Sequence, residues 1–241
     1  LEDTFAVALA GWHDPVVTAL RHLHGHGPMQ LLDGQPVESA EHAALLHATA
    51  GHALDYDDVH LASTTHPSVV IAPALVAAAS LAEPQVRSRM LDSYCVGVAV
   101  NVALGHAMGF EHYRRGWHAT STIGAIAAAA AVGHMYALSA TQIRSALALA
   151  AAQAAGLQRN FGTMAKPVQA GFAAAAGLRA ARMAQAGIDG DQDVFGAGGV
   201  LDIYSGGLRD DGPLELDPSS VSVKLYPCCY ASHRMIAAAI D

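Results

Sequence analysis

Runs of alanine are the feature that most restricts how this chain can fold. Residues 125–131 and 173–176 are almost entirely alanine, and only closely packed, fully buried helices would use such stretches. Helical periodicity dominates the chain, and no convincing alternating strand precedes residue 221. The fold expected is therefore all-α, a large bundle of alanine-rich helices. The expected helices are 2–10, 14–25, 40–54, 68–82, 89–108, 119–136, 140–155, 167–186 and 228–240.

Helix punctuation supports several of these boundaries. Ser139 and Gln142 form a capping box before one helix, and Gly156 is placed to end it. Pro167 is expected to start the next helix and Gly187 to stop it. The segment 187–220 is rich in Gly, Asp and Pro, which predicts a loop with one short helix near 200–204. It lacks the strand context of a dinucleotide-binding or Walker motif, so both are rejected.

Charge and cysteine content indicate which binding partners and which cellular compartment to expect. Thirteen basic and 21 acidic residues give a formal charge of −8, with no basic stripe that could neutralise nucleic-acid phosphates. Three cysteines cannot form a disulfide framework, which favours a reducing, cytoplasmic compartment. Residues 1–3 lack the basic start of a signal peptide, and apolar runs such as 123–133 are too short to span a bilayer. We expect no nucleic-acid and no membrane partner.

Four short segments each place a basic residue just before an expected helix start. The residues are His66 before Pro67, His118 before Ala119, Lys166 before Pro167, and Lys224 shortly before Pro227. Helix N-termini carry unpaired N–H groups and a partial positive charge, so they attract anions. Two histidines and two lysines at such positions predict a small ligand with several carboxylates. Lys166 is notable because a cation is locally unfavourable at a helix start, unless a bound carboxylate offsets the repulsion.

The densest cluster of polar residues lies between His52 and His66, where three carboxylates and three histidines fall within fifteen positions. Such a group could bind a metal, but its spacing matches no standard zinc signature. It could also be a solvated capping loop. The preferred interpretation is an active-site loop in which Asp55 and its neighbours orient His66. No metal ligand is assigned.

Two other segments offer reactive side chains. His118, at the start of a helix, is expected to be neutral and suited to proton abstraction or hydrogen-bond donation. Cys228 or Cys229 could be a thiolate at a helix N-terminus, but a buried or pocket-lining thiol is the preferred interpretation.

Taken in order, five segments resemble the MmgE/PrpD family, which includes 2-methylcitrate dehydratase, cis-aconitate decarboxylase and iminodisuccinate epimerase. The matching segments are HALDYDD at 52–58, HPS at 66–68, GWH at 116–118, GTMAKP at 162–167 and YPCC at 226–229. The resemblance implies a large helical domain, a smaller α+β domain, an active site between them, no cofactor and a homodimer. It also implies a pocket lined by Asp55, His66, His118, Lys166 and Lys224. Val59 stands where relatives often have threonine.

The sequence also predicts how the chain divides into domains and which reaction it catalyses. Residues 1–220 are expected to form the helical domain, and 221–241 a linker and the first helix of the second domain, which is largely absent from this chain. The favoured activity is that of a cofactor-free hydro-lyase on a small di- or tricarboxylate. A base, His66 or His118, would remove a proton alpha to a carboxylate, and Asp55 would orient one imidazole. Lys166, Lys224, Thr163 and Tyr226 would bind the substrate. Epimerisation, decarboxylation or a non-catalytic interaction role are the alternatives.

Overall fold

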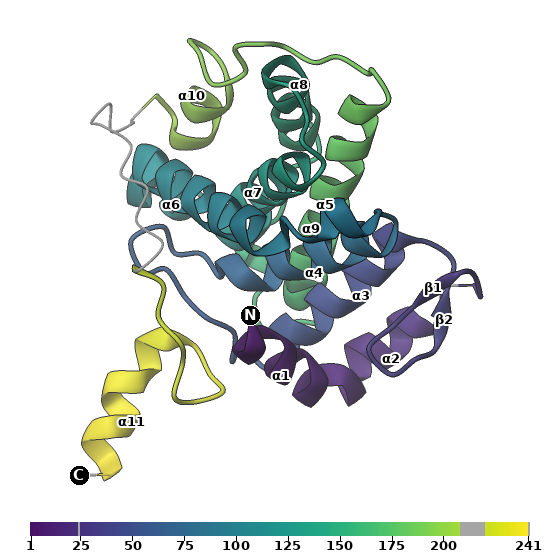
Figure 1. Cartoon of the computed structure of the whole chain (residues 1–241). Helices are drawn as coiled ribbons and strands as arrows, with labels where there is room; N and C mark the ends of the chain where they lie inside the picture. The colour runs from purple at the N-terminus through teal and green to yellow at the C-terminus, as the bar shows by residue number, and fades with distance from the viewer. Residues whose placement is uncertain (24, 208–219, 241) are drawn as a thin grey trace.

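Four alanine-rich helices form the centre of the molecule (Figure 1). They are α3 (Ala40–Ala53), α4 (Pro67–Ser80), α7 (Ala119–Met135) and α9 (Ala165–Gln185). The structure is a computed structural model that describes residues 1–23, 25–207 and 220–240. Within these ranges the expected all-α bundle is confirmed, because helices account for nearly all of the regular structure.

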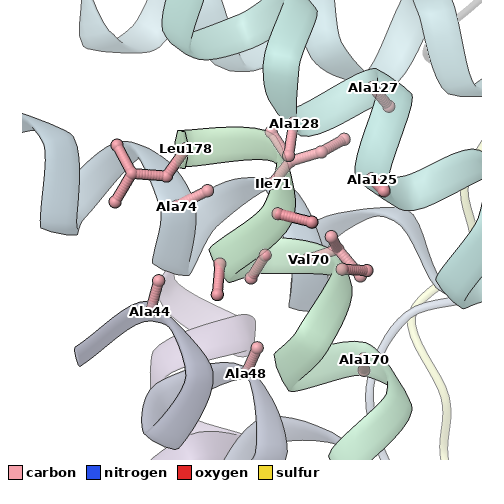
Figure 2. Close-up of a cluster of buried hydrophobic side chains, with 14 of the residues drawn as sticks. Ala44, Ala48, Val70, Ile71, Ala74, Ala125, Ala127, Ala128, Ala170 and Leu178 are labelled. Carbon is pink, nitrogen blue, oxygen red and sulfur yellow. The ribbon is translucent and has the colours of Figure 1, made fainter. Parts of the chain in front are cut away.

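Small side chains allow these helices to lie against one another. Figure 2 shows Ala44 and Ala48 of α3, Val70, Ile71 and Ala74 of α4, Ala125, Ala127 and Ala128 of α7, and Ala170 and Leu178 of α9 in one buried cluster. Gly177 of α9 is required by the closest approach. A Cβ atom there would lie 2.7 Å from the backbone oxygen of Ala125 and 2.5 Å from the Cβ of Ala128. The alanine runs therefore act as predicted, as surfaces for close helix packing.

The other elements surround this centre. They are α1 (Glu2–Ala10), η1 (Gly11–His13), α2 (Pro15–Arg21), α5 (Pro84–Arg87), α6 (Met90–Arg114), α8 (Ala140–Ala151), η2 (Gln158–Asn160), α10 (Val200–Ser205), η4 (Tyr230–Ser232) and α11 (His233–Ile240). Strand β1 (Met29–Gln30) pairs antiparallel with β2 (Pro36–Val37), with Met29 opposite Val37. Figure 1 shows α11 projecting away from the bundle.

Several predicted boundaries were wrong. The β1–β2 hairpin contradicts the expectation of no strand before residue 221. Helix α8 ends at Ala151, so Gly156 does not end it; Gly156 instead has φ +138° and lies against Ser121 and Gln169. No helix begins at Pro227, because α11 starts only at His233.

Other boundaries were close to their predictions. The capping box of Ser139 and Gln142 is confirmed, and α10 matches the short helix expected near 200–204. Helix α9 begins at Ala165 rather than Pro167, and the positive φ of Gly187 follows its end as expected. Of the predicted loop, residues 208–219 lie outside the described ranges, as does residue 24 of the second predicted helix.

Helix α6 is longer than predicted and continues to Arg114 through Gly109, whose φ of +58° interrupts the helical geometry. By length and composition it is the one helix in the described part of the chain that could cross a membrane. However, 56% of its apolar window is buried against the rest of the protein, and it packs on α7 and α4, as a core helix does.

Candidate active site

Three helix N-termini meet at one cavity of about 370 Å³. His66 is the N-cap of α4, His118 is the N-cap of α7, and Lys166 is the second residue of α9. The backbone N–H of His66 donates to Oγ1 of Thr120, 3.1 Å away, which joins the starts of α4 and α7. The cavity is lined by Asp55, Val59, Leu61, Thr64, His66, Tyr113, His118, Thr120, Phe161, Gly162, Lys166, Cys229, Tyr230 and Ala231.

Asp55 is held between two lysines. Its Oδ2 accepts from Nζ of Lys166 at 2.5 Å and its Oδ1 from Nζ of Lys224 at 2.5 Å. Lys224 also donates to the backbone oxygen of Asp55 at 2.7 Å. Burial alone would raise the pKa of Asp55, but the two ammonium groups outweigh it and hold that pKa well below its ordinary value. One carboxylate and two ammonium groups leave a net charge of +1, which can hold an anion.

A short pairing of distant segments brings Lys224 to this position. The backbone N–H of Val59 donates to the oxygen of Ser222 at 2.9 Å, and that of Ser222 donates back to Val59 at 2.8 Å. Lys224 follows two residues later, and its side chain is fully buried beneath Asp55. Residues 220–224 therefore complete the site from the other end of the chain.

Asp57, not Asp55, is the carboxylate that contacts the imidazoles. Its Oδ2 lies 2.7 Å from Nδ1 of His52 and 3.4 Å from Nδ1 of His66. Burial opposes ionisation of Asp57, but the two neighbouring histidines hold its pKa well below the ordinary value. Burial lowers the pKa of His52, so that imidazole is neutral and donates to Asp57. Within the group of Asp55 and its neighbours that was expected to orient His66, Asp57 is the carboxylate that faces the imidazoles, whereas Asp55 contacts the two lysines.

Asp58 has a third, structural role. Its Oδ1 accepts from the backbone N–H of Ser68 at 3.2 Å, and its Oδ2 accepts from the Ser68 hydroxyl. The Ser68 hydroxyl also lies 2.5 Å from the hydroxyl of Tyr94. Asp58 thus caps α4, whose N-cap residue His66 makes no capping bond with its own side chain. Burial, with the charge of Asp57 nearby, raises the pKa of Asp58 to about 6.

His118 is buried and neutral. Burial first, and then the neighbouring His52, His66 and Lys166, hold the pKa of His118 well below its ordinary value, with only Asp57 opposing. A lowered pKa favours the neutral state expected from the sequence, and burial rather than the helix dipole is its first cause. The ring of His118 stacks on that of His52, with 5.5 Å between the ring centroids, and meets the ring of Phe161 edge-on, with 5.0 Å between the centroids.

Three of these groups could in principle ligate a metal. One ligand atom each from His52, Asp57 and His66 lies within 4.8 Å of the others, the single such group found among the described residues. The same atoms are close enough to contact one another directly, and His52 and Asp57 are fully buried. The spacing of the three residues in the sequence matches no standard zinc signature.

The remaining predicted residues lie at different distances from the cavity. Thr163 lines an adjoining cavity of about 450 Å³ together with Asp55 and Lys166, and its hydroxyl accepts from the N–H of Ala165. Tyr226 does not line either cavity; it lies at a separate one of about 230 Å³, against His233. Cys229 lines the main cavity. The roles assigned to these side chains from the sequence stay predictions.

Gln169 is a site residue that the sequence analysis did not single out. It is buried on α9, one helical turn after Lys166, and its Nε2 lies 3.3 Å from Nδ1 of His118. A three-residue spacing from Lys166 places both side chains on one helix face, and this was the signal that could have identified it.

Comparisons with known proteins agree with the resemblance seen in the motifs. Residues 1–211 match the family model described as the MmgE/PrpD N-terminal domain. The chain is 29% identical to the cis-aconitate decarboxylase-like protein oryM of Aspergillus oryzae, over 99% of this chain and 55% of that protein. It is 32% identical to cis-aconitate decarboxylase of Mus musculus, over 82% and 43%, and 27% identical to that of Aspergillus terreus, over 98% and 53%. The chain spans about half the length of these relatives.

Proposed function

Because the chain belongs to the MmgE/PrpD family, we propose that it supplies active-site residues of a lyase that acts on a small di- or tricarboxylate. The observation that supports this most strongly is the Asp55–Lys166–Lys224 cluster. It places a net positive charge beside two histidines in a cavity of about 370 Å³. A cavity of this size accommodates a small acid.

The common chemical step would be formation of an enolate-like anion at the carbon alpha to a carboxylate. Lys166 reaches the cavity, and the N-termini of α4, α7 and α9 meet there, so positive charge surrounds the position where negative charge develops. Preorganised charge of this kind is usually the largest catalytic contribution. His66 and His118 would then move the proton, as the sequence hypothesis expects.

Decarboxylation is the first candidate, because the relatives named above carry that activity in their names. In cis-aconitate, the bond to one carboxyl group would break and release CO2. Its electron pair would shift through the double bond to the carbon alpha to another carboxylate. That carbon would then take one proton from an imidazole, which gives an unsaturated dicarboxylate.

Elimination of water is the second candidate, and it is the activity favoured by the sequence hypothesis. Two imidazoles lie at one cavity with different neighbours, one beside the carboxylate of Asp57 and one beside the amide of Gln169. One would remove the alpha proton of 2-methylcitrate while the other protonates the departing hydroxide. Epimerisation needs only return of the proton on the other face. A non-catalytic interaction role becomes the conclusion if no carboxylic acid is turned over.

The deciding experiment is incubation of the purified protein with cis-aconitate and, separately, with 2-methylcitrate. Release of CO2 from the first supports the decarboxylase proposal, and alkene formation from the second, without CO2, supports the dehydratase. His66→Gln should abolish the turnover, whereas His13→Gln, at an exposed histidine, should not change it. The lyase proposal fails if neither acid reacts while both are shown to bind.

Assembly and location remain predictions. A homodimer and a cytoplasmic location are proposed from the family resemblance and the cysteine content. The mass of the native protein by light scattering tests the first, and cell fractionation tests the second.

A further inference from the structure

His118 has two ring nitrogens, and the structure shows what faces one of them. Its Nδ1 lies 3.3 Å from Nε2 of Gln169, and the ring lines the cavity. An amide nitrogen can donate a hydrogen bond but has no lone pair with which to accept one. Nδ1 of His118 must therefore be the acceptor, and a neutral imidazole in that state carries its proton on Nε2.

The direction of the Gln169 amide determines this assignment, and backbone groups fix it. Oε1 of Gln169 accepts from the backbone N–H of Leu157, while Nε2 lies 3.4 Å from the backbone oxygen of the same residue. The opposite amide orientation would place two oxygens face to face and leave the N–H of Leu157 without its acceptor. Such a loss costs about 1–3 kcal/mol for a buried group. Gln169 is only 6% exposed, so water cannot easily compensate.

The surrounding backbone holds this arrangement in place. The N–H of His118 donates to the oxygen of Gly156 at 3.0 Å, and the hydroxyl of Ser121 donates to the backbone oxygen of Gln169 at 2.9 Å. Gly156 has φ +138°, and a Cβ there would lie 2.8 Å from that of Ser121. The 156–157 segment, the first turn of α7 and the first turns of α9 are thus joined around one imidazole.

His66 has the opposite kind of neighbour. Its Nδ1 lies 3.4 Å from Oδ2 of Asp57, an ionised carboxylate that can only accept. The contact is not a hydrogen bond, but the negative charge favours the tautomer of His66 with its proton on Nδ1 and a lone pair on Nε2. The two imidazoles of the cavity have different partners, one a donor and the other an acceptor.

We propose that Gln169 is a positioning residue that holds His118 as the Nε2–H tautomer, so that His118 is a hydrogen-bond donor in the cavity and His66 is the proton acceptor. The assignment of donor and acceptor rests on the proposed lyase function. The tautomer itself does not, because it follows from the contacts of Gln169.

The test is nitrogen-15 NMR of the protein labelled at histidine, which reports directly which ring nitrogen of His118 is protonated. The signal is assigned by its loss in His118→Asn. Wild-type protein is expected to show Nε2–H. In Gln169→Glu a carboxylate acceptor replaces the amide donor, so the proton is expected to move to Nδ1. Gln185→Glu makes the same chemical change at an exposed position of α9 and should leave the spectrum unchanged.

Kinetics supply the second measurement. Gln169→Glu should lower kcat about 100-fold with little change in KM, because the loss of one hydrogen-bond donor to a developing negative charge costs about 10²–10³-fold in kcat. It should also raise the pH of the kinetic transition that belongs to His118, whose neighbours are His52, His66, Lys166 and Asp57. Gln169→Met, which removes the hydrogen-bond donor without adding a charge, should lower kcat by a smaller factor than Gln169→Glu.

The outcomes separate the two proposals. An Nδ1–H tautomer of His118 in the wild-type protein overturns the inference about Gln169, whatever the activity. An Nε2–H tautomer without turnover of any carboxylic acid supports the inference about Gln169 and overturns the lyase function. If Gln169→Glu does not fold, the wild-type spectrum alone decides the tautomer.

Discussion

The middle and the N-terminal end of α7 are equally buried but opposite in chemistry. Residues 125–131 contact other helices only through alanine, isoleucine and backbone, whereas His118 and Thr120 contact hydrogen-bonding groups of α9 and α4. Helices α4 and α9 show the same division. Packing in the middle of a helix is non-directional and tolerates small adjustments, but each polar group at its end needs one particular partner. Substitutions in the two regions should therefore fail in different ways.

Lys166→Met should give the largest effect and should act on activity alone. Removing one of the two ammonium groups takes the Asp55 cluster from +1 to 0, and we expect kcat to fall about 10³-fold. The melting temperature should change by only a few degrees, because Lys224 still pairs with Asp55. Arg179→Met, at an exposed position of α9, is the control. If the Lys166→Met protein were unfolded, the contrast between the two regions would be wrong, because the N-terminal end of α9 would then also be required for stability.

Gly177→Val should give the converse result, with a loss of stability of about 3 kcal/mol. The new side chain would be forced against Ala125 and Ala128 of α7. Chemical denaturation measures the loss, and kcat of the protein that remains folded should stay close to wild type. Gln185→Val, on the exposed face of the same helix, should cost less than 1 kcal/mol.

Acid should weaken the fold through buried histidines outside the candidate site. Burial lowers the pKa of His47 and of His112 to about 4, against about 6.5 in the unfolded chain. The unfolded chain binds protons below pH 6.5, while the folded chain resists them down to about pH 4. The contribution of each buried histidine to the free energy of unfolding is therefore fully present above pH 6.5. It is lost as the pH falls through this window, by about 2 kcal/mol per histidine at pH 5.

Urea unfolding at pH 7 and pH 5 measures this loss. His47→Gln and His112→Gln should each remove part of the difference between the two pH values, and His22→Gln, at an exposed position, should remove none. An equal pH dependence in all three variants would show that other groups cause the acid sensitivity.

Ser139→Ala should give the smallest effect, a loss of about 1 kcal/mol in the free energy of unfolding. It removes the capping box of α8, which lies outside both regions compared above. Thermal unfolding measures the loss, and activity should not change. A fall in kcat here would show that helix ends away from the cavity also position the catalytic groups.

The sequence predicted the central helices because their signals are local. Alanine runs and helix start residues act within a few positions, and α3, α4 and α7 lie within one or two residues of their expected bounds. The hairpin at 29–37 was missed because its strands are only two residues long, too short for alternation to appear. The helix start predicted at Pro227 was wrong because proline is also common in turns.

For the site, the sequence indicated which segments meet but not which atoms do. Asp55, Asp57 and Asp58 are near neighbours in one loop, yet they contact lysines, histidines and a helix N-terminus respectively. The positive φ of Asp55, +50°, helps the three side chains point in different directions, and no local sequence pattern predicts that backbone angle. Lys224 meets Asp55 across 169 positions of sequence, a distance that spacing rules cannot bridge.

The meeting of three helix N-termini at one cavity also bears on how such a protein can change over generations. Polar groups that line the cavity sit in the cap or first turns of α4, α7 and α9, whereas the closest alanine contacts between the helices lie further along α7 and α9, at Ala125, Ala128 and Gly177. Substitutions at positions that do not share partners have nearly additive effects. A lineage can therefore exchange the residues that line the cavity one mutation at a time, while its thermal stability is maintained by the alanine-rich interior.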